Sequence, residues 1–191
     1  MKKRGYRNLL IGLVLLGLLA LPAAAGAGQA KAKTATATRR TEPHGGLEKR
    51  VRHELVMLPY YSVFDNLEYT VEGYRVTLSG QVTRPTLRTE AEAVVKKIEG
   101  VEEVVNNIEV LPVSFHDDRI RRAAFRAIYG QSSLNRYALQ AVPPIHIIVK
   151  RGQLTLEGVV ANPTEKNIAE MQAKSGSGAF TITNNLRVEK D

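Results

Sequence analysis

The 191-residue sequence contains no cysteine and no tryptophan. Without cysteine the chain can form no disulfide and carries no lipid-modified amino-terminal cysteine, so an oxidising compartment is permitted without being demonstrated. No serine nucleophile motif occurs, and no nucleophile, base and orienting group stand at a workable spacing. The four histidines are dispersed, which favours surface or partly buried roles over a metal site. We therefore predict a protein that is not an enzyme, with no catalytic residue, no metal ligand and no cofactor.

Excess basic charge is nearly absent from the part of the chain expected to fold. The formal net charge is +8, but residues 47–191 contain 19 basic and 18 acidic residues. The remaining excess of basic residues lies in the amino-terminal 46 residues. The positive net charge therefore does not indicate nucleic-acid binding, and we predict no nucleic-acid partner. When residues 47–191 are divided at Pro112, the first part carries a net charge of −3 and the second +4.

The amino terminus has the pattern of a secretory signal peptide. Four basic residues precede a 13-residue apolar run, Leu9 to Leu21, and small residues then offer cleavage sites after Ala25 or Ala27. We expect residues 1–27 to be a cleaved signal peptide. We expect the mature protein to lie in the periplasm, either free or peripherally attached to a membrane. The alternative is an uncleaved membrane anchor. Residues 28–46, rich in Ala, Thr, Lys and Gly, are expected to form a flexible basic linker.

A nine-residue stretch occurs twice, at Tyr74–Val82 and at Gly152–Val160. Both copies have apolar residues at every second position, which is the period of a strand with one buried face. Each has a glycine, Gly80 or Gly158, where the next inward side chain would stand, and this indicates a close backbone approach or a bulge. Aligned at an offset of 78, residues 71–110 and 149–188 share 14 identities in 40 positions, so duplication is the simplest account.

Hydrophobic periodicity predicts the same order of elements in both copies. The fold class is α+β, with two tandem αββαβ modules, each a small three-stranded mixed sheet covered on one face by two helices. The first module spans 47–112 and the second 113–191. The elements expected in the first are helix 47–58, strands 67–71 and 74–82, helix 86–99 with Thr86 as its N-cap, and strand 104–111; those in the second are helix 117–129, strands 145–149 and 153–160, a helix from 164, and strand 180–188.

The asparagine doublets Asn106-Asn107 and Asn184-Asn185 recur at the offset of 78. Asn106 falls in register with inward-facing apolar residues, where an amide must be hydrogen-bonded. We expect bonds to backbone groups, and hence a structural role in preference to ligand binding. Glu90 and Glu92 face different directions on their helix and are interpreted as solvated rather than as paired catalytic carboxylates.

The best candidate for a functional surface is basic. Arg119, Arg122 and Arg126 stand at i, i+3 and i+7 on the helix that opens the second module. Such a face attracts anionic lipid headgroups, at about 1 kcal/mol per basic residue near a charged membrane. An ordinary solvated face, or a docking surface for the acidic first module, remains an open alternative. The basic residues expected nearby are Arg121, Arg136, Lys150 and Arg151.

The amino-acid sequences of both copies resemble the BON domain (bacterial OsmY and nodulation). The resemblance rests on Leu58-Pro59-Tyr60-Tyr61, the segments 71–82 and 105–110, and their counterparts 152–160 and 182–188. It implies an exported or envelope-associated protein that is not an enzyme and binds phospholipid membranes or other envelope components, often under osmotic or envelope stress. No catalytic residues define that family, so none are carried over.

The leading hypothesis is an exported envelope protein that binds anionic phospholipid membranes through Arg119, Arg122, Arg126, Lys150 and Arg151, in envelope maintenance or osmotic stress. The alternative hypothesis is a protein-interaction module that docks on a cell-wall or secretion component through strand edges or its first module.

Overall fold

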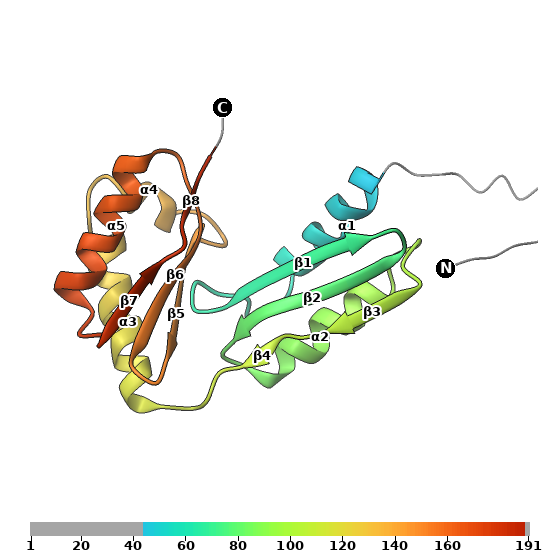
Figure 1. The fold of residues 1–191 in the computed structure, drawn as a ribbon, viewed down its shortest axis with the longest axis horizontal. Coiled ribbons are helices and arrows are strands. Elements are labelled where there is room, and N and C mark those ends of the chain that lie inside the picture. Colours follow the sequence, from blue (N-terminus) through green and yellow to red (C-terminus); the bar gives the residue numbers. More distant parts are fainter. Residues whose placement is uncertain (1–43, 190–191) are drawn as a thin grey trace, which may run out of the picture. The chain divides into compact units, whose positions relative to one another are not determined.

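The computed structural model describes residues 44–189 and confirms an α+β fold of two repeated modules (Figure 1). The expected signal peptide and all but the last three residues of the expected linker lie outside the described residues. Within those residues, no helix combines the length and the apolar character that a membrane crossing requires. The first module contains α1 (His44–Val56), β1 (Asn66–Glu72), β2 (Arg75–Val82), α2 (Pro85–Lys96), β3 (Glu103–Asn106) and β4 (Glu109–Val110); the second contains α3 (Phe115–Tyr129), α4 (Asn135–Ala138), β5 (Ile145–Lys150), β6 (Gln153–Val160), α5 (Pro163–Gly176), β7 (Thr181–Asn184) and β8 (Arg187–Val188).

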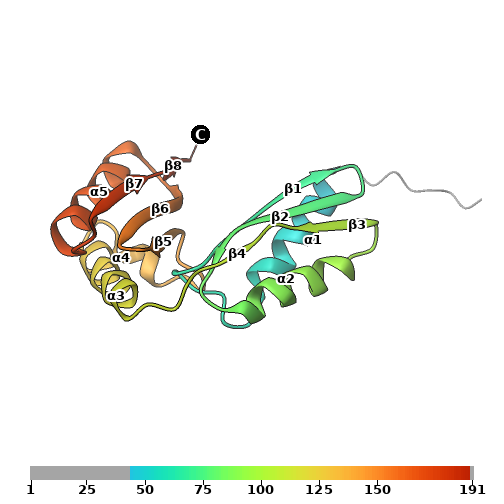
Figure 2. The ribbon, with the colours of Figure 1, turned by 60° about the horizontal axis from the view of Figure 1, so that its bottom comes forward.

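The two sheets have the same topology. In the first module β1 and β2 are antiparallel and joined by a two-residue turn, while β3 and β4 both pair parallel with β2. In the second module β5, β6, β7 and β8 repeat this arrangement. The expected third strand is thus present in both modules but interrupted. Figure 2 shows the long helices of each module on one face of its sheet, as the alternation of apolar residues requires.

A separate hydrophobic core fills each module. In the first, Val76, Leu78 and Val82 of β2 are fully buried against the apolar stripes of α1 and α2. In the second, Leu154, Leu156 and Val160 of β6 are buried at the equivalent positions. The two-residue period of the duplicated strand therefore provides the centre of each core, as the sequence predicts.

A short segment of the first module also enters the core of the second. This segment, residues 59–65 between α1 and β1, is called the strap below. Its Val63 is buried in the second core, and the Val63 carbonyl accepts a 2.7 Å hydrogen bond from the Ile147 amide in β5. The fully buried Asp65 fixes the strap by accepting hydrogen bonds from Ser62 and Thr83. The described residues, 44–189, accordingly lie within one compact unit.

The two repeated glycines occupy backbone conformations that other residues avoid. Gly80 has φ +105° and Gly158 has φ +117°. A Cβ on Gly80 would overlap the carbonyl of Asn66, and one on Gly158 would overlap the carbonyl of Pro144. The expected close backbone approach is therefore present at both positions.

Several expected helix boundaries are wrong. The first helix begins at His44, inside the stretch expected to be linker, and ends at Val56. The helix of the first repeat begins at Pro85 after Arg84, which has extended backbone and makes no side-chain cap, so Thr86 is not the N-cap. Proline at the first helical position already has the φ that a helix needs, which explains the earlier start.

Candidate functional site

The basic helix face is the set of exposed arginines on α3, Arg119, Arg122 and Arg126. The helix is fixed at its start by Ser114, whose hydroxyl accepts a 3.2 Å hydrogen bond from the Asp117 amide. Its opposite face buries Ile120, Ala124 and Ile128 in the second core. Because a helix rises about 1.5 Å per residue, the three guanidinium groups extend over roughly 10 Å of one exposed face. The structure thus exposes these three residues together, as the sequence predicts.

Three of the other expected basic residues are engaged elsewhere. Arg121 is 5% exposed, donates to the Val149 carbonyl at 2.6 Å and forms an ion pair with Asp118. The two remaining residues form ion pairs at 2.5 Å, Arg136 with Glu165 and Lys150 with Glu109 of the first module. Arg121 was expected near the basic helix face, but it is buried, because residues two apart on a helix face different directions.

Arg151 is exposed and is held close to the start of α3. It occupies the first position of the turn between β5 and β6, with φ +53°, and Gly152 follows. The buried Asp117 carboxylate accepts the backbone N–H groups of Arg151 at 2.9 Å and Gly152 at 2.8 Å. Asp117 therefore ties the turn that carries Arg151 to the start of α3.

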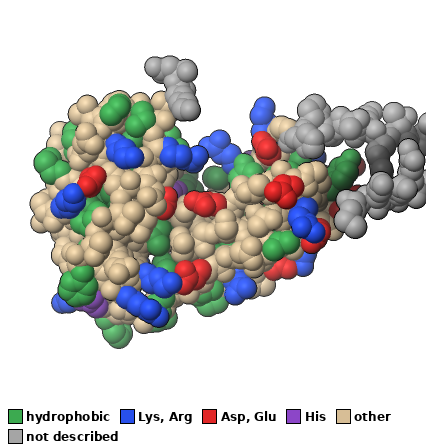
Figure 3. Space-filling view, viewed as in Figure 1, with side chains coloured by type: hydrophobic (Ala, Val, Ile, Leu, Met, Phe, Trp, Pro, Cys, Tyr) green, Lys and Arg blue, Asp and Glu red, His purple; other side chains and the backbone are tan. Residues whose placement is uncertain are grey.

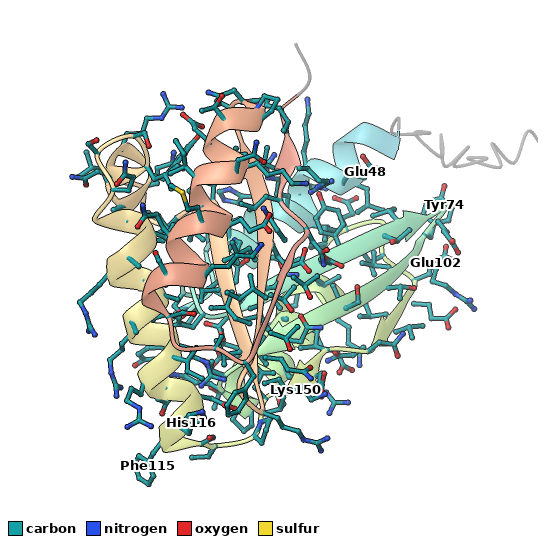
Figure 4. The ribbon with its side chains drawn as sticks, turned by 60° about the vertical axis from the view of Figure 1, so that its left-hand side comes forward. Glu48, Tyr74, Glu102, Phe115, His116 and Lys150 are labelled. Atoms are coloured by element: carbon teal, nitrogen blue, oxygen red, sulfur yellow. The ribbon has the colours of Figure 1, made fainter. Side chains whose placement is uncertain are left out.

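Three large apolar side chains near the start of α3 and before β7 are exposed, and the sequence analysis missed them. We call Val113, Phe115 and Phe180 the apolar tip; they are 93%, 91% and 78% exposed. The ring of Phe180 lies over Gly152 and stacks on His116 at 5.7 Å between centroids. Figure 4 shows Phe115 and His116 together at one end of α3, with Phe115 pointing outward. In Figure 3 hydrophobic, histidine and basic side chains lie side by side at this end of the second module.

Charge and apolar surface are therefore adjacent at one end of the second module. His116 connects them, since its ring contacts Phe180 and its Nδ1 lies 3.1 Å from an Arg119 nitrogen. Large exposed apolar side chains gathered beside polar groups mark interaction sites. The sequence contained a signal for this exposed apolar surface. Val113 and Phe115 are apolar residues outside the buried stripe of α3, and Phe180 precedes the final strand.

The repeated asparagines have the expected structural role. The Nδ2 group of Asn106 donates to the Arg88 carbonyl at 2.9 Å and to Glu92 at 3.0 Å, while its Oδ1 accepts from the Ile108 amide. In the second module Asn184 makes the matching bonds with Lys166, Glu170 and Leu186. Where the third strands are interrupted, the backbone N–H groups of Asn107 and Asn185 donate to the carbonyls of Leu78 and Leu156.

Glu92 and Glu170 are therefore parts of two structural clamps, and the interpretation of Glu92 as merely solvated was incomplete. The pKa of Glu170 lies below its ordinary value of 4.5 because Lys174 and then Asn184 donate hydrogen bonds to the carboxylate. The pKa of Glu92 is lowered in the same way by Lys96 and Asn106. The identity of these Glu, Lys and Asn positions between the repeats was the signal that could have revealed them.

We expect Asn184→Ala to raise the pKa of Glu170 toward 4.5, because the carboxylate loses one of its two donors. A carboxylate whose pKa is lowered by folding stabilises the folded state at pH values above its ordinary pKa. That contribution is lost as the pH falls through the pKa of the folded state. Carboxyl titration by NMR measures the shift. Asn185→Ala is the control, since Asn185 donates to Glu157 instead; an equal shift in both variants would contradict the assignment.

Comparison with known proteins identifies the modules. The BON domain family matches residues 45–112 and 131–190. The chain belongs to the BON domain family. BON domains are non-catalytic binding modules associated with membrane and phospholipid binding and with osmotic stress proteins, and BON proteins are typically found in the envelope or periplasm. The second match begins after α3, so the basic helix face lies just outside it.

The chain also has weak matches among solved structures. CdsD, a structural protein of the type III secretion system of Chlamydia trachomatis, matches at 10% identity over 76% of this chain and 94% of that chain, with a TM-score of 0.29. The C-terminal domain of CdsD matches at 10% identity over 75% of this chain and 98% of that one, with a TM-score of 0.27. No curated protein matches the BON chain significantly. Between residues 44 and 189, no group of three or more histidine or acidic side chains could hold a metal ion.

Proposed function

We propose that this BON protein is a non-enzymatic, exported envelope protein that binds anionic phospholipid membranes, in envelope maintenance or osmotic stress. The contact is made by the apolar tip and the basic helix face of the second module, together with Arg151. The observation that carries the proposal is the exposure of two phenylalanines beside four exposed arginines. The membrane and phospholipid association of BON domains supports it.

Both kinds of side chain contribute to such binding. Aromatic rings enter the boundary between headgroups and acyl chains, where burial of their apolar area is favourable. Arginines next to the rings stay among the headgroups and gain about 1 kcal/mol each near an anionic surface. Neither term alone gives firm attachment, because single weak anchors bind membranes reversibly. The arrangement therefore favours a peripheral protein that selects anionic lipid.

Vesicle co-sedimentation tests the proposed function. The full chain is mixed with vesicles of phosphatidylglycerol or of phosphatidylcholine at matched lipid concentration. We expect binding to the anionic vesicles that weakens as salt is raised, because salt screens the arginines. Equal binding to both lipids would contradict the proposal.

The apolar contribution is tested by the double variant Phe115→Ser with Phe180→Ser. We expect roughly tenfold weaker binding to phosphatidylglycerol vesicles, since partial burial of two rings contributes on the order of 1 kcal/mol or more. Leu139→Ser is the matched control, because Leu139 is 86% exposed in the same module but lies outside the apolar tip. Unchanged binding by the double variant would show that the rings stay out of the membrane.

A further inference from the structure

The outer edge of β1 has unpaired backbone groups. β1 pairs only with β2, and Glu72 and Arg75 flank the two-residue turn between them. Backbone groups alternate between the two sides of a strand, so those of Thr70 and Glu72 face β2 and those of Tyr69 and Val71 face outward. No described residue makes a backbone hydrogen bond to this outer edge of Tyr69 and Val71. Such an edge is a template for another strand.

This edge faces a continuous groove. A cavity of about 700 Å³ follows β1 from Leu67 to Val71, and its opposite side is formed by β6 and β8. A second cavity of about 660 Å³ opens at the start of β1 and shares Leu67, Glu68 and Tyr69 with the first. Six residues of an extended chain span about 20 Å, so a short strand fits the length of β1. We call the two cavities together the edge groove.

One end of the edge groove is an apolar pocket with a histidine in its wall. His146 is 9% exposed, and Tyr61 of the strap stacks on its ring at 5.7 Å between centroids. The imidazole also lies against the backbone of Ser62 and Asp65 in the strap, so it forms part of the pocket wall. Leu55, Val56, Val142 and Pro144 complete the apolar part of the wall. Charged residues also line this cavity, namely Arg52, Glu68, Glu157 and Arg187.

Acidic side chains outnumber basic ones along the edge groove. Glu48, Glu68 and Glu157 line it, against the guanidinium groups of Arg52 and Arg187. None of the three carboxylates forms an ion pair within residues 44–189. Charge complementarity therefore selects a basic occupant for the edge groove.

We propose that the outer edge of β1 binds an extended basic peptide segment of a partner protein as an added strand, with an apolar or aromatic side chain at one end of the segment entering the His146 pocket. Main-chain hydrogen bonds to Tyr69 and Val71 hold the segment, and its basic side chains meet the carboxylates. This mode of recognition derives affinity from the backbone and selectivity from the pocket. It uses residues separate from the apolar tip and the basic helix face, and is independent of the proposed lipid binding.

Amide exchange followed by NMR tests the added strand on the full chain. The probes are two synthetic peptides, Tyr-Lys-Val-Lys-Val-Lys and its reverse, which place the aromatic anchor at either end. We expect one of them to slow exchange of the Tyr69 and Val71 amides about tenfold or more at saturation. The Thr70 amide, already bonded to β2, changes little. Absence of protection at Tyr69 and Val71 with both peptides overturns the proposal.

Two controls distinguish an added strand from charge attraction. A peptide with glutamate in place of lysine is expected to give at least tenfold weaker binding, because it faces the carboxylates. Val71→Pro removes an outward N–H without removing a bond to β2, and is expected to abolish protection at Tyr69. Protection of Tyr69 that persists in a folded Val71→Pro variant, or equal binding of the acidic peptide, counts against the proposal. If Val71→Pro does not fold, the exchange pattern of the unmodified chain decides.

Discussion

The variant Arg119→Glu, Arg122→Glu, Arg126→Glu is expected to lose binding to phosphatidylglycerol vesicles by about a hundredfold or more. Removing three basic residues from an anionic surface forfeits about 3 kcal/mol, and the three carboxylates that replace them are repelled. All three side chains are exposed on α3, so folding should be little affected. Co-sedimentation at low and high salt measures the loss, which should shrink as salt screens the charges.

A matched control separates this local effect from the change in net charge. Lys49 and Arg88 are exposed on the two helices of the first module, and Lys97 is exposed at the C-cap of α2. Their replacement by glutamate changes the net charge by the same amount, and we expect much weaker effects on vesicle binding. If both triple variants lose binding equally, the basic helix face is not the contact and the proposed orientation on the membrane is wrong.

Gly158→Ala is expected to destabilise the fold by about 3 kcal/mol or more. At φ +117° an L-residue is strained, and the new Cβ would overlap the Pro144 carbonyl. Neither backbone segment can move without disturbing the pairing of β5 with β6. Urea unfolding of the full chain measures the loss of free energy.

Gly178→Ala provides the comparison for that variant. Gly178 also has a positive φ, +72°, but a Cβ there would meet nothing within 4 Å. Only the left-handed backbone conformation is penalised, so we expect a loss of about 1 kcal/mol. Similar losses in the two variants would show that the close approach of the Pro144 carbonyl contributes little to the requirement for glycine.

Most of the architecture follows from local pattern. The alternation around Leu78 and Leu156 predicts a strand with one buried face, and the repeated Pro-Thr places the helix that follows. The inward register of Asn106 predicts a satisfied amide, which the bonds to Arg88 and Ile108 provide. These features depend on a residue and its near neighbours, which is why sequence periodicity is sufficient for them.

Features that depend on tertiary packing were not predictable in the same way. Val63 is an isolated apolar residue in a loop, and only the folded chain shows that it lies in the core of the second module. Arg121 carries the same charge as its neighbours, and only its bond to the Val149 carbonyl distinguishes it. Phe180 lies 65 positions after Phe115 in the sequence, and only the folded chain shows its ring over Gly152 and stacked on His116, next to Phe115. No short-range period connects such residues.

The strap has a consequence for the order in which the chain matures. Val63 is synthesised long before Ile147, its hydrogen-bond partner 84 positions later. Until β5 is available, the strap of a nearly finished first module presents an apolar side chain with no core to enter. Contacts between residues so distant in sequence form slowly. The strap of the first module is therefore buried only when the second module folds. In the interval before that, the exposed Val63 side chain is a site that a chaperone would cover.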